Sequence, residues 1–375
     1  MALSCEMHTA YLYDRGGRKR LASLDDLERV KWERRRDDPS TATVYIGTPG
    51  IECQKALGLA EAGRTELVIY RGKERVWEGP ITRISYKGWS VELEARDVMV
   101  YIVRLIMKGE YNNRHPNTST VLDRVKRILT AELARKEALD PPVNVLSHIQ
   151  YIYATPGEAE DARTTAKTLP YEMTVFEHID NYAARGGLDY TVVGRSILFF
   201  DVHQKIGQTA MVTADDFIGD PVITQYGMEL ATYVAHTDGK GNWGDAGGTD
   251  EYYGLWEVLH QAYDEDGSDP QKPQDPPSTA ELEDQAKRTH LQGSKPPLVV
   301  RIPDNTRLNP NGVLTISDLV PGVWIPLSAS LPGRTVSQMQ KLDSMTVEET
   351  AENGEEIKVT LSPAYAQTFV EDEEE

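Results

Sequence analysis

Strand-like alternation in residues 66–97 constrains the fold of this chain more than any other feature. In ELVIYRGKERVWEGPITRISYKGWSVELEARD, apolar and polar residues exchange every one or two positions, and the pattern breaks at RGK and KG. A period of two is typical of β-strands, and such breaks are typical of hairpin turns. Trp89, Val91 and Leu93 fall on one face of the last run, which predicts a half-buried strand.

The same pattern extends over residues 1–110. Leu67 and Ile69 lie on one face of their strand, and Val68 and Tyr70 lie on the other. Because both faces are apolar, we expect one to meet the core and the other to meet a neighbouring chain or domain. About four hairpin-like pairs in this region predict an antiparallel barrel or sandwich, with strands at MHTAYLY, RKRLASL, RVKWERR, TATVYIG, ELVIY, ERVWEG, ITRISY and WSVELEA.

The period then changes to that of helices. Asp97 is the expected N-cap of a helix over 98–107, and 120–139 is a second helix. A strand in NVLSHIQYIYA, a helix over 169–187 closed by Gly186 and a hairpin around Gly194 follow, which predicts a small α+β domain over 111–207. The apolar stripe of the second helix is Val121, Leu122, Val125, Ile128, Leu129 and Leu133.

Strand signals return in residues 208–375, with a hairpin turn at Asn353-Gly354, and a repeat of one barrel type in the first and last thirds of the chain is a hypothesis at this point. An insertion over about 237–296 interrupts this region. Its Gly-rich part, 237–252, is expected to be mobile, and its acidic, Pro-rich part ends in a helix capped at Ser278. The chain closes in an acidic tail, 371–375. The predicted class is therefore α+β and mainly β, with a β-rich first and last part around a small α+β domain.

Charge excludes several classes of partner. The 375 residues carry 40 Lys and Arg against 59 Asp and Glu, a net charge of −19. The balance is +2 in residues 1–110 and −21 in the remainder, so non-specific binding to nucleic acid or an anionic membrane is not expected. We find no signal peptide and no apolar run of about 20 residues, so we expect no membrane insertion.

A search for reactive groups predicts no catalytic, cofactor-binding or metal-binding residue, so we expect no enzyme. Cys5 and Cys53 are expected to be reduced thiols, and no two of the eight histidines have metal-ligand spacing. Asp215 and Asp216 are interpreted as a loop pair. Two further groups of charged residues are also interpreted without chemistry. A solvated linker accounts for Asp264, Asp266 and Asp269. For Arg34, Arg35 and Arg36 we expect either ion pairs with Asp37 and Asp38 or an oligomer interface.

Two other functions stay open at this stage. One is a cell-wall hydrolase, since the acidic residues could include a catalytic pair. The other is a carbohydrate-binding module, in which Tyr252, Tyr253 and Trp256 would stack on sugars. Residues at this alternating spacing are more often part of a core, and we expect that here.

The order of motifs resembles that of siphophage tail-tip hub proteins, a minor tail protein family of the actinobacteriophage type. The resemblance covers most of 1–110 and 210–365, and is vaguer between them. It is carried by WERRRDDPSTATVYI, then ELVIYRGKERVWEGPITRISYKGWSVELEARDVMVYIVRLI, and later EYYGLWEVL, STAELEDQAKRTH, DLVPGVWIPL and EEIKVTLSP.

The resemblance implies a baseplate-hub fold similar to the central hub of contractile-phage baseplates. Two β-barrels per chain would assemble as a homotrimer, so that six barrels form a ring. The implied partners are the distal tail protein ring, the tape-measure protein and other tail-tip proteins, with transient passage of phage DNA. The implied location is the tip of the virion tail, after folding and assembly in the host cytoplasm.

Overall fold

The computed structural model describes residues 7–47, 49–111, 120–138, 148–154, 170–184, 187–219, 222–225, 227–261, 277–296, 298–301, 306–331 and 334–364. Cys5, Gly186, the acidic linker with Asp264, Asp266 and Asp269, and the tail 371–375 lie outside the described residues.

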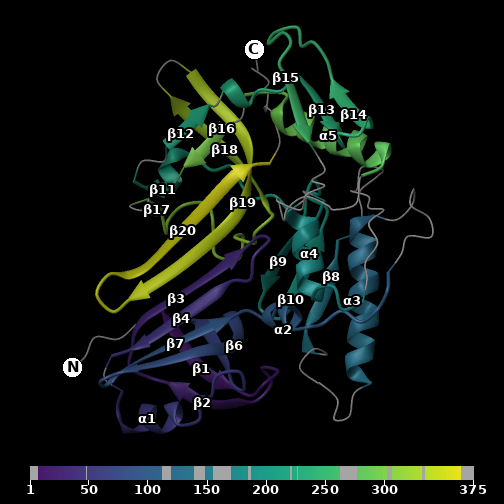
Figure 1. Cartoon of the computed structure of the whole chain (residues 1–375). Coiled ribbons are helices and arrows are strands. Elements are labelled where there is room, and N and C mark those ends of the chain that lie inside the picture. The colour runs from purple at the N-terminus through teal and green to yellow at the C-terminus, as the bar shows by residue number, and fades with distance from the viewer. Residues whose placement is uncertain are drawn as a thin grey trace.

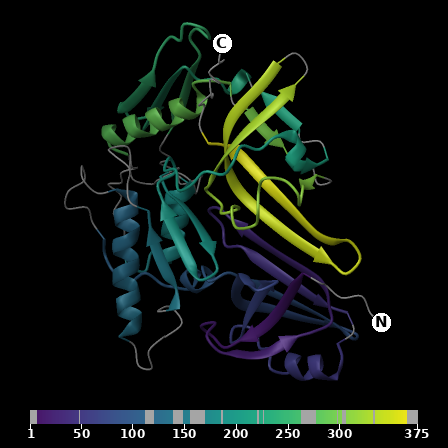
Figure 2. The same cartoon turned by 180° about the vertical axis from the view of Figure 1, so that it is seen from behind.

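One antiparallel sheet of ten strands forms the largest part of the molecule (Figures 1 and 2). Its order is β18-β19-β3-β4-β7-β6-β5-β1-β2, and β20 pairs with the other side of β19. A short helix, α1 (Ile51–Leu57), lies beside β2. The strands are β1 (His8–Tyr13), β2 (Arg20–Leu24), β3 (Leu27–Arg35), β4 (Thr41–Ile46), β5 (Glu66–Arg71), β6 (Glu74–Lys87), β7 (Ser90–Arg96), β18 (Trp324–Leu331), β19 (Arg334–Thr350) and β20 (Gly354–Pro363).

The alternation in 66–97 is confirmed as strands, with two differences. The runs ERVWEG and ITRISY form one strand, β6, because Gly79 lets it pass close to β7: a Cβ there would lie 1.9 Å from the Arg96 carbonyl oxygen. Trp89 is exposed, because it lies in the β6–β7 turn beyond the last strand pair, whereas Val91 and Leu93 are buried. The predicted Asn353-Gly354 turn is present, with Gly354 at φ +73° between β19 and β20.

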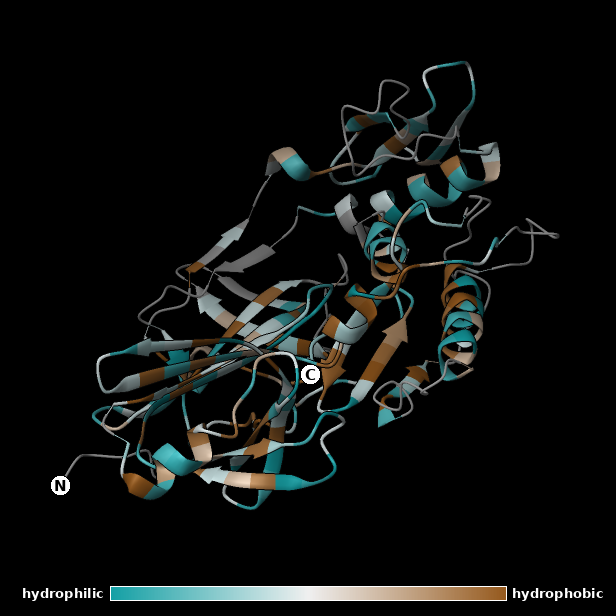
Figure 3. Cartoon of the chain, turned by 60° about the horizontal axis from the view of Figure 1, so that its bottom comes forward, coloured by the Kyte–Doolittle hydropathy of each residue, from teal (hydrophilic) through white to brown (hydrophobic). Residues whose placement is uncertain are grey.

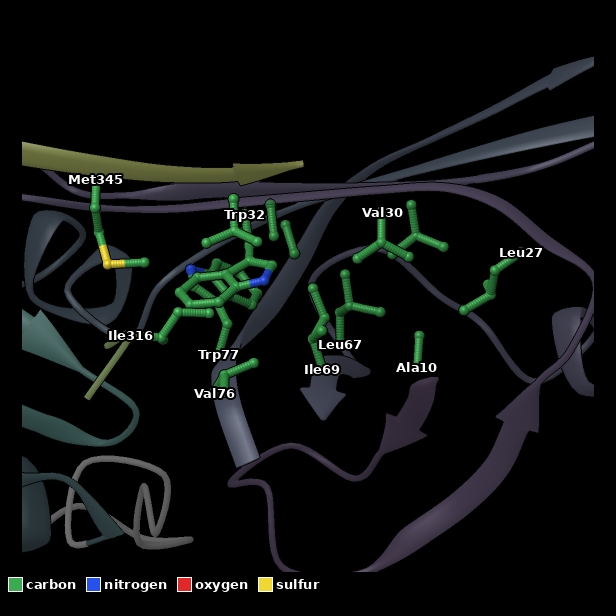
Figure 4. Packing of buried hydrophobic residues seen from close by; sticks show 14 of the residues in the cluster. Ala10, Leu27, Val30, Trp32, Leu67, Ile69, Val76, Trp77, Ile316 and Met345 are labelled. Atoms are coloured by element: carbon green, nitrogen blue, oxygen red, sulfur yellow. The ribbon is translucent and has the colours of Figure 1, made fainter. Parts of the chain in front are cut away.

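Because β3 pairs with β19, strands from the first and the last part of the chain belong to one sheet. Trp32 is aligned with Val347, and Arg34 with Met345. The apolar side chains below the sheet form one core that draws on residues 10–95 and 212–361. Figure 4 shows Trp32 in this core beside Trp77, with Met345 and Ile316 nearby.

A second core lies within the small α+β module, which we define as residues 98–200. Its strand order is β8-β10-β9, with β8 parallel to β10, and helices pack against it. The predicted α3 stripe is buried as far as Leu129, Leu133 is partly buried, and Figure 3 shows apolar and polar segments alternating along this helix. The elements are α2 (Val100–Val103), α3 (Val121–Glu137), β8 (Gln150–Tyr153), α4 (Val175–Ala184), β9 (Asp189–Val193) and β10 (Ser196–Phe200).

The helix predicted over 98–107 is wrong in length, since α2 spans only four residues. The chain leaves the helix at Leu105, whose carbonyl accepts from Val175 N at 2.9 Å. Asp97 is not its N-cap. Instead its carboxylate accepts from Ser40 N and Oγ, both at 2.6 Å, and from Met99 N at 2.9 Å.

The Gly-rich segment 237–252, expected to be mobile, contains a strand. β14 (Trp243–Gly247) pairs with β13 (Tyr233–Thr237), which pairs in parallel with β15 (Glu257–Gln261). Glycine is needed here for packing: a Cβ on Gly244 would lie 2.2 Å from Glu283 N in helix α5 (Thr279–Gly293). The predicted helix start is confirmed, because Ser278 and Glu281 form a reciprocal cap.

Two short ladders complete the described structure: β11 (Phe217–Ile218) with β17 (Arg307–Leu308), and β12 (Val222–Gln225) with β16 (Leu298–Arg301). The fold is thus α+β and mainly β, as the sequence predicts. Among the described residues the strand pairs form no closed barrel. The boundaries 1–110, 111–207 and 208–375 stay predictions.

Candidate assembly site

The groups screened for chemistry have structural roles in the part of the chain that the structure describes. Cys53 is buried, its thiol donates to the Asp25 carbonyl at 3.2 Å, and burial raises its pKa. Asp216 accepts from Thr213 N at 2.8 Å and Val313 N at 2.9 Å, whereas Asp215 is exposed. These contacts match the interpretation of a loop pair.

No group of three or more His, Cys, Asp or Glu side chains among the described residues is arranged to hold a metal ion. His236 and His260 stack with ring centroids 4.8 Å apart, and burial lowers the pKa of His236 to about 4. None of the described helices has both the length and the apolar character needed to cross a bilayer.

The three consecutive arginines have three different environments. Arg35 is half-exposed and pairs with Asp38 at 2.9 Å, as predicted. Arg34 is buried and donates to the carbonyls of Ile316, Leu319 and Val76 at 3.2–3.3 Å, and burial lowers its pKa to about 10. The third arginine, Arg36, reaches the small α+β module.

Arg36 is the centre of a charged cluster at the end of β3, which we call the junction. Its Nη1 lies 2.9 Å from Asp189 Oδ1 and 3.4 Å from Asp37 Oδ2, and its Nε lies 3.0 Å from Asp343 Oδ1. Lys341 also pairs with Asp189. Burial would lower the pKa of Arg36, but the charges of Asp189 and Asp343 outweigh it and the pKa is raised.

A second polar contact holds the other end of the α+β module. Arg195 Nη1, between β9 and β10, lies 2.6 Å from Glu66 Oε2 and 3.3 Å from Glu78 Oε2. Tyr101 Oη donates to Glu66 at 2.6 Å. These contacts lie on the face of β5 and β6 that points away from the main core, where Val68 is fully buried. We expected this face to meet a neighbouring chain or domain, and it meets another part of the same chain. Charged groups thus join the module to the sheet at both contacts.

Sequence reasoning missed the junction because its members are far apart in the chain. Asp189 is the single charge of β9, whose other residues are mostly apolar, whereas Lys341 lies in β19 among other polar and charged residues. A charge in a buried strand needs a partner, and that need was the available signal. The register shift between Leu342 and Ser344 places Asp343 at an irregularity of β19, and no local pattern predicts it.

Exposed aromatic and apolar side chains lie in and beside the small sheet β14-β13-β15, which α5 contacts. Tyr252 is 87% exposed and Trp256 is 41% exposed, so the expectation that they belong to a core is wrong. The Trp256 ring nitrogen donates to the Tyr253 carbonyl at 3.0 Å. We call this the aromatic surface: Trp243, Tyr252, Leu255, Trp256 and Leu259.

Solved structures of several known proteins share this architecture. The prophage tail protein gp18 from Listeria monocytogenes superposes with a TM-score of 0.60 over 94% of both chains, at 8% identity. A tail protein from Neisseria meningitidis matches with a TM-score of 0.55 over 96% of this chain and 97% of that one, at 13% identity. The chain has a phage tail-protein fold.

The 43 kDa tail protein of prophage MuSo2 from Shewanella oneidensis gives the same result, with a TM-score of 0.55, 12% identity, and 96% and 97% coverage. No protein-family model matches the sequence, and no curated protein matches it. At identities this low, the likeness concerns the fold alone.

Proposed function

We propose that this protein is a structural component of a bacteriophage tail, and that it forms the baseplate hub at the tail tip. One observation carries the proposal: nearly the whole chain shares its fold with tail proteins of similar length. Each module and the long β19–β20 hairpin are included in that likeness, because the match covers 94–96% of this chain.

The assembly we propose is a homotrimer. Each subunit would supply two barrel-like modules, one from 1–110 and one from 208–375, to a ring of six. This ring would contact the distal tail ring and the tape-measure protein on one side and other tip proteins on the other. The strand pairing of β3 with β19 supports it, since it fixes the two modules of one subunit to each other.

DNA would leave through the axis of this trimer. The balance of −21 in residues 111–375 supports an acidic wall, since like charge keeps phosphate from binding. The proposal assigns no catalytic residue, and the protein would reside in the virion.

The first test is the mass of the purified chain by light scattering, followed by its position in tails by cryo-electron microscopy. We expect a trimer on the tail axis. A monomer that never enters particles, or a single copy away from the axis, would overturn the proposal. Release of muropeptides from cell walls by the pure protein would instead favour the hydrolase alternative.

A second candidate function is carbohydrate binding at the aromatic surface. The exposure of Tyr252 and Trp256 favours it, because an exposed ring face can stack on a sugar. Binding to a glycan array, lost in Trp256→Ala but retained in Trp89→Ala, would support it. Trp89 is the matched control because it is 77% exposed on a different module. Equal binding by both variants would exclude this surface.

A further inference from the structure

The turn between β19 and β20 has a sequence that can react with its own backbone. It reads Ala351-Glu352-Asn353-Gly354. In such a pair the backbone nitrogen of the glycine can attack the side-chain amide carbon of the asparagine, because glycine has no Cβ to hinder a close approach. Figures 1 and 2 show this turn at the outer end of the long yellow hairpin. Whether the reaction occurs in the folded chain depends on how firmly the turn is held.

Asn353 and Gly354 are exposed, and little holds them in place. A Cβ on Gly354 would meet no heavy atom within 4 Å. The side-chain amide of Asn353 makes no hydrogen bond with any residue that the structure describes, and its backbone N donates to Thr350 Oγ1 at 3.1 Å. Thr350 and Gly354 form the last pair of the β19–β20 ladder. The turn can therefore open by fraying one ladder end, which is the least stable part of a hairpin.

The chain has one other asparagine–glycine pair, and its environment is the opposite. Gly312 N donates to the Asn309 carbonyl at 2.9 Å, and Asn311 N donates to Asn309 Oδ1 at 3.0 Å. The next amide, Val313 N, donates to Asp216 Oδ1 at 2.9 Å. A Cβ on Gly312 would lie 2.9 Å from that same oxygen. The peptide between Asn311 and Gly312 is thus fixed on both sides, and turning it breaks several hydrogen bonds.

We propose that Asn353 is a modification site, at which the folded chain converts asparagine to aspartate and isoaspartate without an enzyme. The Gly354 nitrogen forms a bond to Cγ of Asn353 and loses its proton. The bond from Cγ to Nδ2 breaks, ammonia leaves with that proton, and an imide ring remains. Water then opens the ring at either carbonyl carbon, which gives aspartate or isoaspartate. The only co-reactant is water, and the site does not depend on the function proposed above.

Isoaspartate would loosen the outer end of the hairpin. It carries the main chain through the former side-chain carbon, so the turn gains a backbone atom and the last pair of the ladder loses its register. The next pair is Glu349 with Glu355, and both members bind the first strands of the chain. Glu349 Oε2 lies 2.8 Å from His8 Nδ1 in β1, and Glu355 accepts from Arg71 in β5 at 2.7 and 2.8 Å. The modification therefore acts where the hairpin is joined to β1 and β5.

The experiment is timed incubation of the folded full chain in mild alkali, with peptide mapping by mass spectrometry. We expect conversion at Asn353 to be about tenfold faster than at Asn311, which is the order of one net hydrogen bond in the opening step. In the chain unfolded in urea the two rates should be similar, because both sites then share the same reactive pair. Fragmentation by electron transfer distinguishes isoaspartate from aspartate.

Hydrogen exchange before and after incubation tests the consequence. In wild type we expect amides of 349–355 to lose protection, while β4 and β7 keep theirs. Asn353→Gln is the matched control, because it keeps the amide but needs a larger ring to react, so its exchange should not change on incubation. Freshly prepared Asn353→Asp carries the new charge without the additional backbone atom, and it should exchange like wild type before incubation.

Two results would overturn the proposal. Conversion at Asn353 that is no faster than at Asn311 in the folded chain would show that the β19–β20 turn is held as firmly as the other. Unchanged exchange in 349–355 after isoaspartate has formed would show that the hairpin does not depend on this turn. The rate comparison uses wild type alone, so it stands whether or not a variant folds.

Discussion

His8 and Glu349 are hydrogen-bonded at 2.8 Å across 341 residues of sequence. The bond joins the first strand of the chain to the long β19–β20 hairpin. Glu349 also accepts from Met7 N and His8 N, both at 2.9 Å, and His8 accepts from the Trp32 ring nitrogen at 3.1 Å. A buried polar chain thus runs from the edge of the hairpin into the main core.

We predict that Glu349→Ala lowers the free energy of unfolding by about 3 kcal/mol, because it leaves two backbone amides and the His8 ring without their acceptor. Urea denaturation followed by tryptophan fluorescence measures it. Glu348→Ala is the control: its pair with Arg29 is exposed to solvent, so about 0.5 kcal/mol is expected. Equal losses would show that Glu349 acts only as a strand residue.

The Gly244→Ala variant tests whether the Gly-rich segment is ordered by the close packing of β14 against α5. Gly244→Ala would place a methyl group 2.2 Å from Glu283 N, so α5 must move away from β14. We expect a loss of about 2 kcal/mol, in the range found for overpacked cores. Hydrogen exchange should rise in β13–β15 and α5. Gly248→Ala, where a Cβ meets nothing within 4 Å, should leave exchange unchanged.

The sequence predicts the strands well because each has its own period of two and its own turn. The β6–β7 and β19–β20 hairpins are examples, since Gly88 and Gly354 both have the positive φ that such turns need. Helix α3 is predicted for the same local reason, through its apolar stripe.

Long-range pairing is what the sequence does not reveal. Nothing near Trp32 predicts that Val347 lies beside it, because register depends on two distant strands together. The glycine content of segment 237–252 predicts mobility, yet glycine is required at 244 and 247 for close packing. Gly244 lies against α5, and Gly247 lies against the Thr232 carbonyl oxygen. The junction cannot be predicted from the sequence for the same reason as the sheet pairing, because two partners of Arg36 lie 153 and 307 residues away in the chain.

Asp97 predicts a pH dependence below neutrality. Burial raises its pKa to about 6, against about 3.9 in an unfolded chain. Between these values the folded chain holds a proton that the unfolded chain releases. The free energy of unfolding therefore falls as pH rises from 4 to 6, by about 3 kcal/mol from this group, and the loss is complete by pH 7.

Asp97→Asn should remove this contribution. The variant also loses one of the two acceptor oxygens that receive Ser40 and Met99, so it is less stable at all pH values. The difference from wild type should be larger at pH 4 than at pH 7. Urea titrations at both values measure it, and Asp25→Asn, on the surface, should follow wild type. A constant difference would mean that folding does not raise the pKa of Asp97.

Arg34 is a buried cation whose two terminal nitrogens donate to three carbonyl groups. Arg34→Ala would leave the carbonyls of Ile316, Leu319 and Val76 without their donor, so we expect a loss of about 3 kcal/mol. Arg29→Ala, at a half-exposed position of the same strand, should cost less than about 1 kcal/mol. Because Ile316 and Leu319 lie outside any strand, hydrogen exchange in 314–320 should rise first in Arg34→Ala. If exchange there does not change, the guanidinium contributes through its contact with the Trp32 ring, 5.3 Å away, and not through these hydrogen bonds.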